Sequence, residues 1–115
     1  MGWAAERKLE MAMAVYDDTA KLIAFAHMDG ARTGSNSLAR DKAKSAASFR
    51  IATADMAKMN VSSVPGIVGA GGGVPFMAAD GSPLGAMGVS GGTAQEDIDC
   101  AKAGIMAAGL TFQTQ

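Results

Sequence analysis

The stretch GAMGVSGG, residues 85–92, holds four glycines and one serine among small or apolar residues. Thr93 and Glu96 follow it three residues apart, the spacing of a capping box at the start of a helix. A glycine-rich turn at the amino end of a helix offers backbone N–H groups to an anion. Glycines are equally needed where a strand packs too closely against a helix for side chains to fit. The stretch is therefore either a phosphate loop or a tightly packed strand.

The residues around the stretch disfavour the phosphate loop. No Lys-Ser or Lys-Thr pair follows the last glycine, as a P-loop requires. The spacing differs from a dinucleotide fingerprint, and the stretch comes late in the chain instead of opening a βαβ unit. Glu96 and Asp97 would also place negative charge where a phosphate would bind. We expect a strand packed closely against a helix.

Composition indicates one small domain spanning residues 1–115. The net charge of −1 provides no basic field for nucleic acid. Cys100 is the only cysteine, so no internal disulfide forms. No apolar run approaches the roughly 20 residues of a membrane span, and the start MGWAAERKLE lacks the apolar core of a signal peptide. We expect a cytoplasmic protein without nucleic-acid or membrane partners.

Two apolar segments near the start predict a β-hairpin. Residues 11–16, MAMAVY, and 21–27, KLIAFAH, flank the turn-forming sequence DDTA. Both segments are apolar on both alternating faces, which is typical of strands that are covered on both sides. Because so short a chain has few elements to provide that cover, we expect another subunit to supply it.

The rest of the chain predicts two helices separated by short strands. Apolar residues at helical spacing indicate a helix over residues 37–53, with Ser35 or Ser37 as its cap. A final helix is expected to begin at Thr93. This order indicates an α+β fold with one mainly antiparallel sheet. The later strands are predicted at residues 67–69, 71–78 and 84–91.

Four motifs in order resemble one known family. They are MDGA at residues 28–31, the pair Lys42-Ala43, GGGVP at residues 71–75, and GAMGVSGGT at residues 85–93. Together they resemble the GlcG/HbpS-like haem-binding domain family, which includes the carboxy-terminal domain of PduO proteins. The resemblance covers roughly residues 9–110.

The resemblance implies a profilin-like α+β domain with an antiparallel sheet of about five strands and helices packed on it. It also implies a ligand-binding homo-oligomer, from dimer to octamer, that takes haem or a related carboxylate-bearing ligand. Two departures stand out. The family opens with a full helix, but only residues 2–9 precede the first strand here, so that helix is shortened or absent. The residue before Met-Asp-Gly is commonly arginine, and here it is His27.

The expected pocket combines the MDGA loop, one face of the first long helix and the GGGVPF strand. Arg32 and Lys42 would pair with ligand carboxylates, and His27 is the candidate ligand of haem iron. Lys42 falls on an otherwise apolar helix face, so it either extends to solvent or points into a pocket. The remaining expected ligand-binding residues are Asp29, Gly72, Gly73, Phe76 and Ser90.

Two alternatives remain open from the residues alone. One is a small catabolic enzyme that acts on an organic acid without haem, with Lys42 or His27 as the acid–base group. The low aromatic content of 5 % favours it, because a macrocycle usually needs more aromatic wall. The other is a structural or assembly domain, which the two-sided apolar strands favour.

Overall fold

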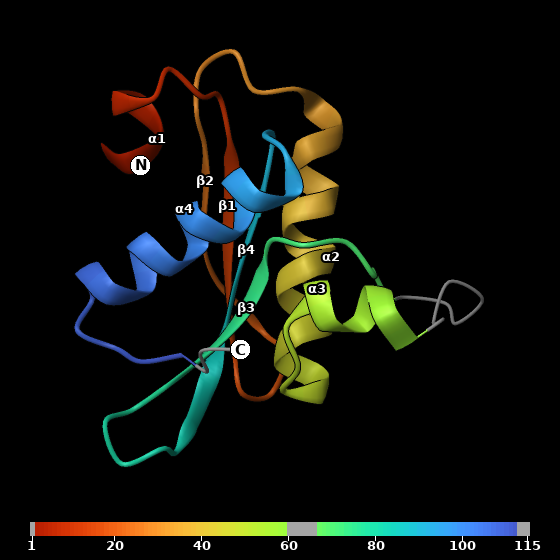
Figure 1. Ribbon diagram of the computed structural model, residues 1–115, viewed down its shortest axis with the longest axis vertical. Helices are drawn as coiled ribbons and strands as arrows, with labels where there is room; N and C mark the ends of the chain where they lie inside the picture. Colours follow the sequence, from red (N-terminus) through yellow and green to blue (C-terminus); the bar gives the residue numbers. More distant parts are fainter. Residues whose placement is uncertain (1, 60–66, 113–115) are drawn as a thin grey trace.

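A computed structural model describes residues 2–59 and 67–112 of the chain. In this part, four antiparallel strands form one sheet in the order β2-β1-β4-β3. Helix α2 packs on one face of the sheet, and α4 with the short α1 packs on the other (Figure 1). The elements are α1 (Gly2–Glu6), β1 (Ala12–Asp17), β2 (Leu22–His27), α2 (Thr33–Phe49), α3 (Thr53–Met56), the 3₁₀ turn η1 (Ala57–Met59), β3 (Gly73–Met77), β4 (Pro83–Ser90) and α4 (Ala94–Ala107).

This architecture confirms the α+β class and the antiparallel sheet. The sheet has four strands in the described part of the chain, where about five were expected. The predicted strand at residues 67–69 is not formed. There the backbone N–H of Val68 donates to the hydroxyl of Ser45 on α2, at 3.1 Å, instead of entering the sheet. A side-chain hydroxyl thus satisfies a backbone donor that a neighbouring strand would otherwise bind.

The two faces of β1 bury residues of different size. Ala12 and Ala14 point toward α2 and pack against Ala39 and Ala43 of that helix. Met13 points to the other face, into the cluster under α4. Alternation over the first three residues of the strand therefore places alanines toward α2 and a methionine toward α4, while Tyr16 packs further along on the α2 face. The alanines of β1 therefore meet alanines of α2, with no large side chain between them at this point.

Gly88 lies in β4 at the point of closest approach to α2. A Cβ atom at this position would overlap the carbonyl oxygen of Ala39 and lie 2.6 Å from the backbone nitrogen of Ala43. Only glycine fits between strand and helix there. The prediction of a tightly packed strand from residues 85–92 is confirmed.

The two long helices begin in different ways. Helix α4 has the predicted capping box: Thr93 Oγ1 accepts from Glu96 N at 3.2 Å, and Glu96 Oε1 accepts from Thr93 N at 2.9 Å. Helix α2 begins at Thr33, earlier than predicted, and its N-cap residue Arg32 makes no side-chain cap bond. The prediction of a cap at Ser35 or Ser37 is wrong, because both residues lie inside the helix.

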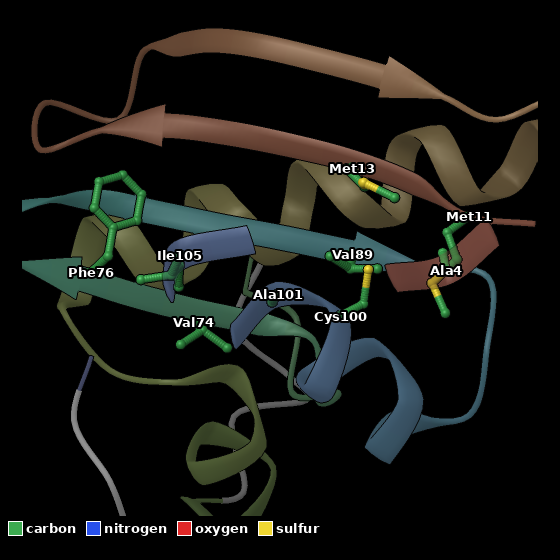
Figure 2. Close-up of a cluster of buried hydrophobic side chains, with 9 residues drawn as sticks. All are labelled: Ala4, Met11, Met13, Val74, Phe76, Val89, Cys100, Ala101 and Ile105. Atoms are coloured by element: carbon green, nitrogen blue, oxygen red, sulfur yellow. The ribbon is translucent and has the colours of Figure 1, made fainter. Parts of the chain in front are cut away.

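The core under α4 is rich in sulfur and small apolar side chains. Side chains from β1, β3 and β4 meet α4 and the short α1, as Figure 2 shows. Among the buried members in the described chain Phe76 is the one aromatic residue, and the partly buried Trp3 and Phe112 pack against the cluster. The buried members of the cluster are Ala4, Met11, Met13, Val74, Phe76, Val89, Cys100, Ala101 and Ile105.

β2 forms an edge of the sheet, and its side chains stay largely exposed. The side chains of Leu22, Ile23 and Phe25 are all exposed, and Ile23 is 61 % accessible. β1 is covered on both faces as predicted, but the described part of the chain leaves β2 largely uncovered. No helix in the described part of the chain is long and apolar enough to cross a membrane.

Replacing Gly88 with alanine tests the helix–strand contact. We expect Gly88→Ala to lower the free energy of unfolding by about 1–3 kcal/mol, because the new methyl group forces α2 away from β4. Gly34→Ala is the matched control, because no atom lies within 4 Å of a Cβ built there. We expect it to change stability by less than about 1 kcal/mol. Urea unfolding measures both, and equal stabilities would contradict the contact.

Candidate functional site

A cavity of about 550 Å³ opens at the end of the sheet where β1 begins, β2 and β4 end, and α2 begins. Its volume falls within the usual range for small-molecule sites, about 300–1,000 Å³. Three segments that are far apart in sequence, within residues 8–10, 30–38 and 90–92, converge on it. The lining residues are Lys8, Leu9, Glu10, Gly30, Arg32, Gly34, Ser35, Leu38, Ser90, Gly91 and Gly92.

Charged and apolar groups share this cavity. Lys8 and Arg32 contribute positive charge, and Glu10 contributes negative charge. The side chain of Glu10 lies against Gly30, where a Cβ atom would be only 2.5 Å from its carboxyl carbon. Leu9 and Leu38 add apolar wall. The mixture suits a ligand with both an apolar body and an anionic group.

The structure divides the predicted site residues among separate places. Arg32 and Ser90 line the cavity together. Lys42 and Gly72 lie beside each other at the start of β3, where Lys42 is enclosed. Gly73 lines a different cavity of about 150 Å³. The expected roles of these residues stay predictions, but one shared pocket does not form in the described chain.

Lys42 forms a buried ion pair with Asp97 of α4. Its Nζ lies 3.0 Å from Asp97 Oδ2 and donates to the carbonyl oxygen of Val89, also at 3.0 Å. The two side chains are only 5 % and 4 % accessible. An acid–base or carboxylate-binding role of Lys42 would therefore require this pair to open.

Gly72 borders the ion pair, and only glycine fits at this position. Its φ is +129°, and a Cβ atom would lie 2.5 Å from the carbonyl oxygen of Val89 and 3.0 Å from Lys42 Nζ. Gly73 is held separately, because its N–H donates to Thr53 Oγ1 at 2.9 Å. The glycines of the GGGVP motif thus give Lys42 room to reach across the end of the sheet.

Asp97 also connects the ion pair to the cavity. Its Oδ1 accepts from the backbone N–H of Gly92 at 2.9 Å, and Gly92 lines the cavity wall. The sequence alone does not reveal this role, because an aspartate in the first turn of a helix also suits the helix dipole. The available signal was Lys42 itself, since a lysine on an apolar helix face needs a buried partner.

Burial raises the pKa of the Asp97 carboxyl. The hydrogen bond from Gly92 and the charge of Lys42 act in the opposite direction but do not outweigh the loss of hydration. Burial also raises the pKa of the Cys100 thiol, with the Asp97 carboxylate adding to the effect. Cys100 therefore lacks the thiolate character of a reactive cysteine.

His27 lies at the end of β2 and contacts α2. Its Nδ1 donates to the side-chain oxygen of Asn36, which leaves Nε2 as the nitrogen that could bind a metal. The residue is exposed and does not line the cavity. In residues 2–59 and 67–112, no three His, Cys, Asp or Glu side chains gather to hold a metal ion.

The other two predicted residues lie apart from the cavity. Asp29 is exposed in the turn that Ala31 N closes onto Met28 O at 3.0 Å. Phe76 is buried in the core under α4 (Figure 2). Phe76 also borders a third cavity, of about 220 Å³, at the opposite end of the sheet from Arg32 and Ser90.

Comparison with known proteins identifies the family. The model of the haem degrading protein HbpS-like family matches residues 2–106, nearly the whole chain. The chain belongs to this family. A search of curated proteins finds no match.

Solved structures of similar fold extend the comparison. The PduOC:heme complex superposes with a TM-score of 0.87 at 23 % identity, covering 96 % of this chain and 87 % of that one. Protein ORFY of Klebsiella pneumoniae superposes with a TM-score of 0.86 at 24 % identity, and the match covers 94 % of this chain and 81 % of that one. A double mutant of Streptomyces reticuli HbpS gives 0.84 at 28 %, covering 92 % and 76 %. At these identities, the first two show the shared fold alone.

The raised pKa of Asp97 predicts how the effect of Asp97→Asn on stability depends on pH. A folded-state pKa above the unfolded value means that the folded protein binds this proton more tightly. Wild type therefore gains stability relative to Asp97→Asn as pH falls through the raised pKa, and the gain is complete below the ordinary value of about 4. Urea unfolding between pH 7 and pH 4 measures the free energy of unfolding of both proteins. We expect the value for wild type minus the value for Asp97→Asn to increase toward pH 4.

Asp99→Asn is the control for this experiment, because it removes one exposed carboxylate from the same helix. A decrease toward pH 4 in the free energy of unfolding of wild type minus that of Asp97→Asn would contradict the prediction. It would mean that Lys42 and Gly92, and not burial, dominate the pKa of Asp97.

Proposed function

We propose that this protein binds haem or a related carboxylate-bearing ligand in the 550 Å³ cavity, as a homo-oligomer. The observation that carries the proposal is the cavity itself, where Lys8 and Arg32 stand beside the apolar side chains of Leu9 and Leu38. Cations of this kind pair with carboxylates, and Arg does so in two-point geometry. Membership of the haem degrading protein HbpS-like family supports haem as the first ligand to test.

Two kinds of group suit haem: the cations Lys8 and Arg32 in the lining of the cavity, and the imidazole of His27, which lies outside the lining and contacts Asn36 of α2. His27 carries a ring nitrogen that its bond to Asn36 leaves available, and imidazole is a common axial ligand of haem iron. Lys8 and Arg32 would face the carboxylates of the macrocycle. When bound, haem supplies a redox-active iron, and this chain supplies the imidazole and the surrounding charge. The PduOC:heme complex has the same fold as this chain.

Titration with hemin tests whether the protein binds haem and whether His27 ligates its iron. We expect a shift of the Soret band on binding, and we expect His27→Ala to lose that shift because the imidazole ligand is gone. Lys44→Ala is the matched control, since Lys44 is exposed on α2 and does not line the cavity. A wild-type protein without any Soret shift would exclude haem. An unchanged spectrum in His27→Ala would exclude only His27.

The edge strand β2 supports the homo-oligomer. Met28 N donates to Met11 O at 3.0 Å, so alternate residues along β2 direct their peptide groups toward β1. The peptide groups of Phe25 and His27 therefore point to the outer edge, where no strand of the described chain pairs with them. An apolar edge strand that carries no charged residue in its centre is ready to pair with another chain. We propose that a second copy covers it.

A charge on this edge tests the interface. We expect Ile23→Lys to convert the assembly to monomers, because it places a charge where the copies meet. Met106→Lys is the control, since Met106 is 65 % accessible on α4, away from β2. Native mass spectrometry measures the state of each variant. A monomeric wild type would contradict the oligomer, and an unchanged assembly in Ile23→Lys would contradict this interface.

A further inference from the structure

Two buried serines face the same cavity from different elements. Ser35 lies in the first turn of α2 and is 8 % accessible, while Ser90 ends β4 and is 4 % accessible. Ser90 pairs with Ala12 across the sheet, so its side chain points to the α2 face. Both residues line the 550 Å³ cavity. The start of the helix and the end of the strand thus bring two hydroxyl groups to one wall.

Neither serine hydroxyl has a hydrogen-bond partner within residues 2–59 and 67–112. In the same part of the chain, every fully enclosed side-chain nitrogen or oxygen atom does have one. The two hydroxyl oxygens must therefore reach open space, and the space that both residues border is the cavity. Buried polar groups are normally satisfied by hydrogen bonds, so these two are available to a ligand.

The amino end of α2 adds further donors at this wall. The N–H of Ser35 already donates to the carbonyl oxygen of Arg32 at 3.0 Å, but the N–H groups before it have no intrahelical partner. Here Arg32 supplies no side-chain cap, and no acidic residue lies in the first turn. Helix α4 differs in both respects, with a capping box and two acids in its first turn. The positive end of α2 is left uncompensated by its own residues and attracts an anion.

The charges around the cavity restrict the anion. Lys8 and Arg32 favour negative charge, and Glu10, two residues after Lys8, disfavours it. Two cations and a helix end against one carboxylate suit a single negative charge better than several. Two hydroxyl donors match the two oxygens of a carboxylate. The chemistry therefore favours a monocarboxylate over a phosphate ester.

We propose that Ser35, Ser90 and the amino end of α2 form a carboxylate subsite within this cavity. The inference rests on the proposed function, because it takes the cavity to be the ligand site. The carboxylate belongs either to a small free acid or to a haem propionate, since both present the same group. Lys42 has no part in this subsite, because its ammonium is held by Asp97 and Val89.

Amide NMR with acetate as the probe tests the subsite in the 115-residue chain. At constant ionic strength, acetate is expected to shift the backbone amide signals of Gly34, Ser35 and Gly91. Acetamide has nearly the same shape without the charge, and we expect it to leave those signals in place. Equal shifts with both probes, or no shift with acetate, would overturn the proposal.

Alanine variants separate a ligand-binding serine from a structural one. Ser35→Ala and Ser90→Ala remove hydroxyls that bond to no protein group, so the urea unfolding midpoint should stay unchanged. Loss of a hydrogen bond to a charged group should raise the Kd for acetate about tenfold. Ser37→Ala is the control, because Ser37 is exposed on the same helix and does not line the cavity. A lowered midpoint with an unchanged Kd would overturn the subsite.

Hemin added with and without acetate identifies the source of the carboxylate. Competition between the two would support a propionate in the subsite, whereas acetate shifts that persist in the presence of hemin would support a free acid. Acetate binding without hemin binding would overturn the haem proposal and leave the subsite standing. If hemin bound equally well to wild type and to the double variant Ser35→Ala/Ser90→Ala, and acetate caused no shifts, the subsite would be overturned and the haem proposal would stand.

Discussion

The close approach of α2 to β4 is the constraint on which the rest of the structure depends. Gly88 leaves no side chain between the strand and the backbone of Ala39, so helix and sheet are nearly in backbone contact. Protein interiors are packed densely enough that a single methyl group at such a point displaces an element. Alanines continue the contact along α2. The position of this helix decides where every side chain on its inner face can reach.

Lys42 shows the consequence of that position. It lies one turn beyond Ala39, and from there its ammonium reaches past the end of β4 to Asp97, on the helix that covers the opposite face. The ion pair therefore joins the two helical layers across the sheet. Burying both charges is costly, and removing one partner alone leaves the other unpaired. The same carboxylate holds Gly92, so the packing of the core and the wall of the cavity share one hydrogen-bond network.

Several local features could be predicted from the sequence because short-range interactions decide them. Thr93 and Glu96 cap the last helix at the predicted place, since the capping box involves only residues three apart. The alanine spacing of α2 and the glycines of β4 indicated close packing correctly. The start of α2 was misplaced, because no side chain caps it and the sequence therefore carries no local signal there.

By itself, the sequence determined the fold class, the order of most elements and the family, because these follow from hydrophobic periodicity, turn residues and ordered motifs along the chain. Tertiary structure alone decided which of the predicted residues meet. It buried Lys42 against Asp97, 55 positions away. It also placed Ser90 and Ser35 in the lining of the same cavity at the end of the sheet. Such pairings depend on how strands and helices stack in space, and side chains far apart in sequence leave no pattern that records their contact.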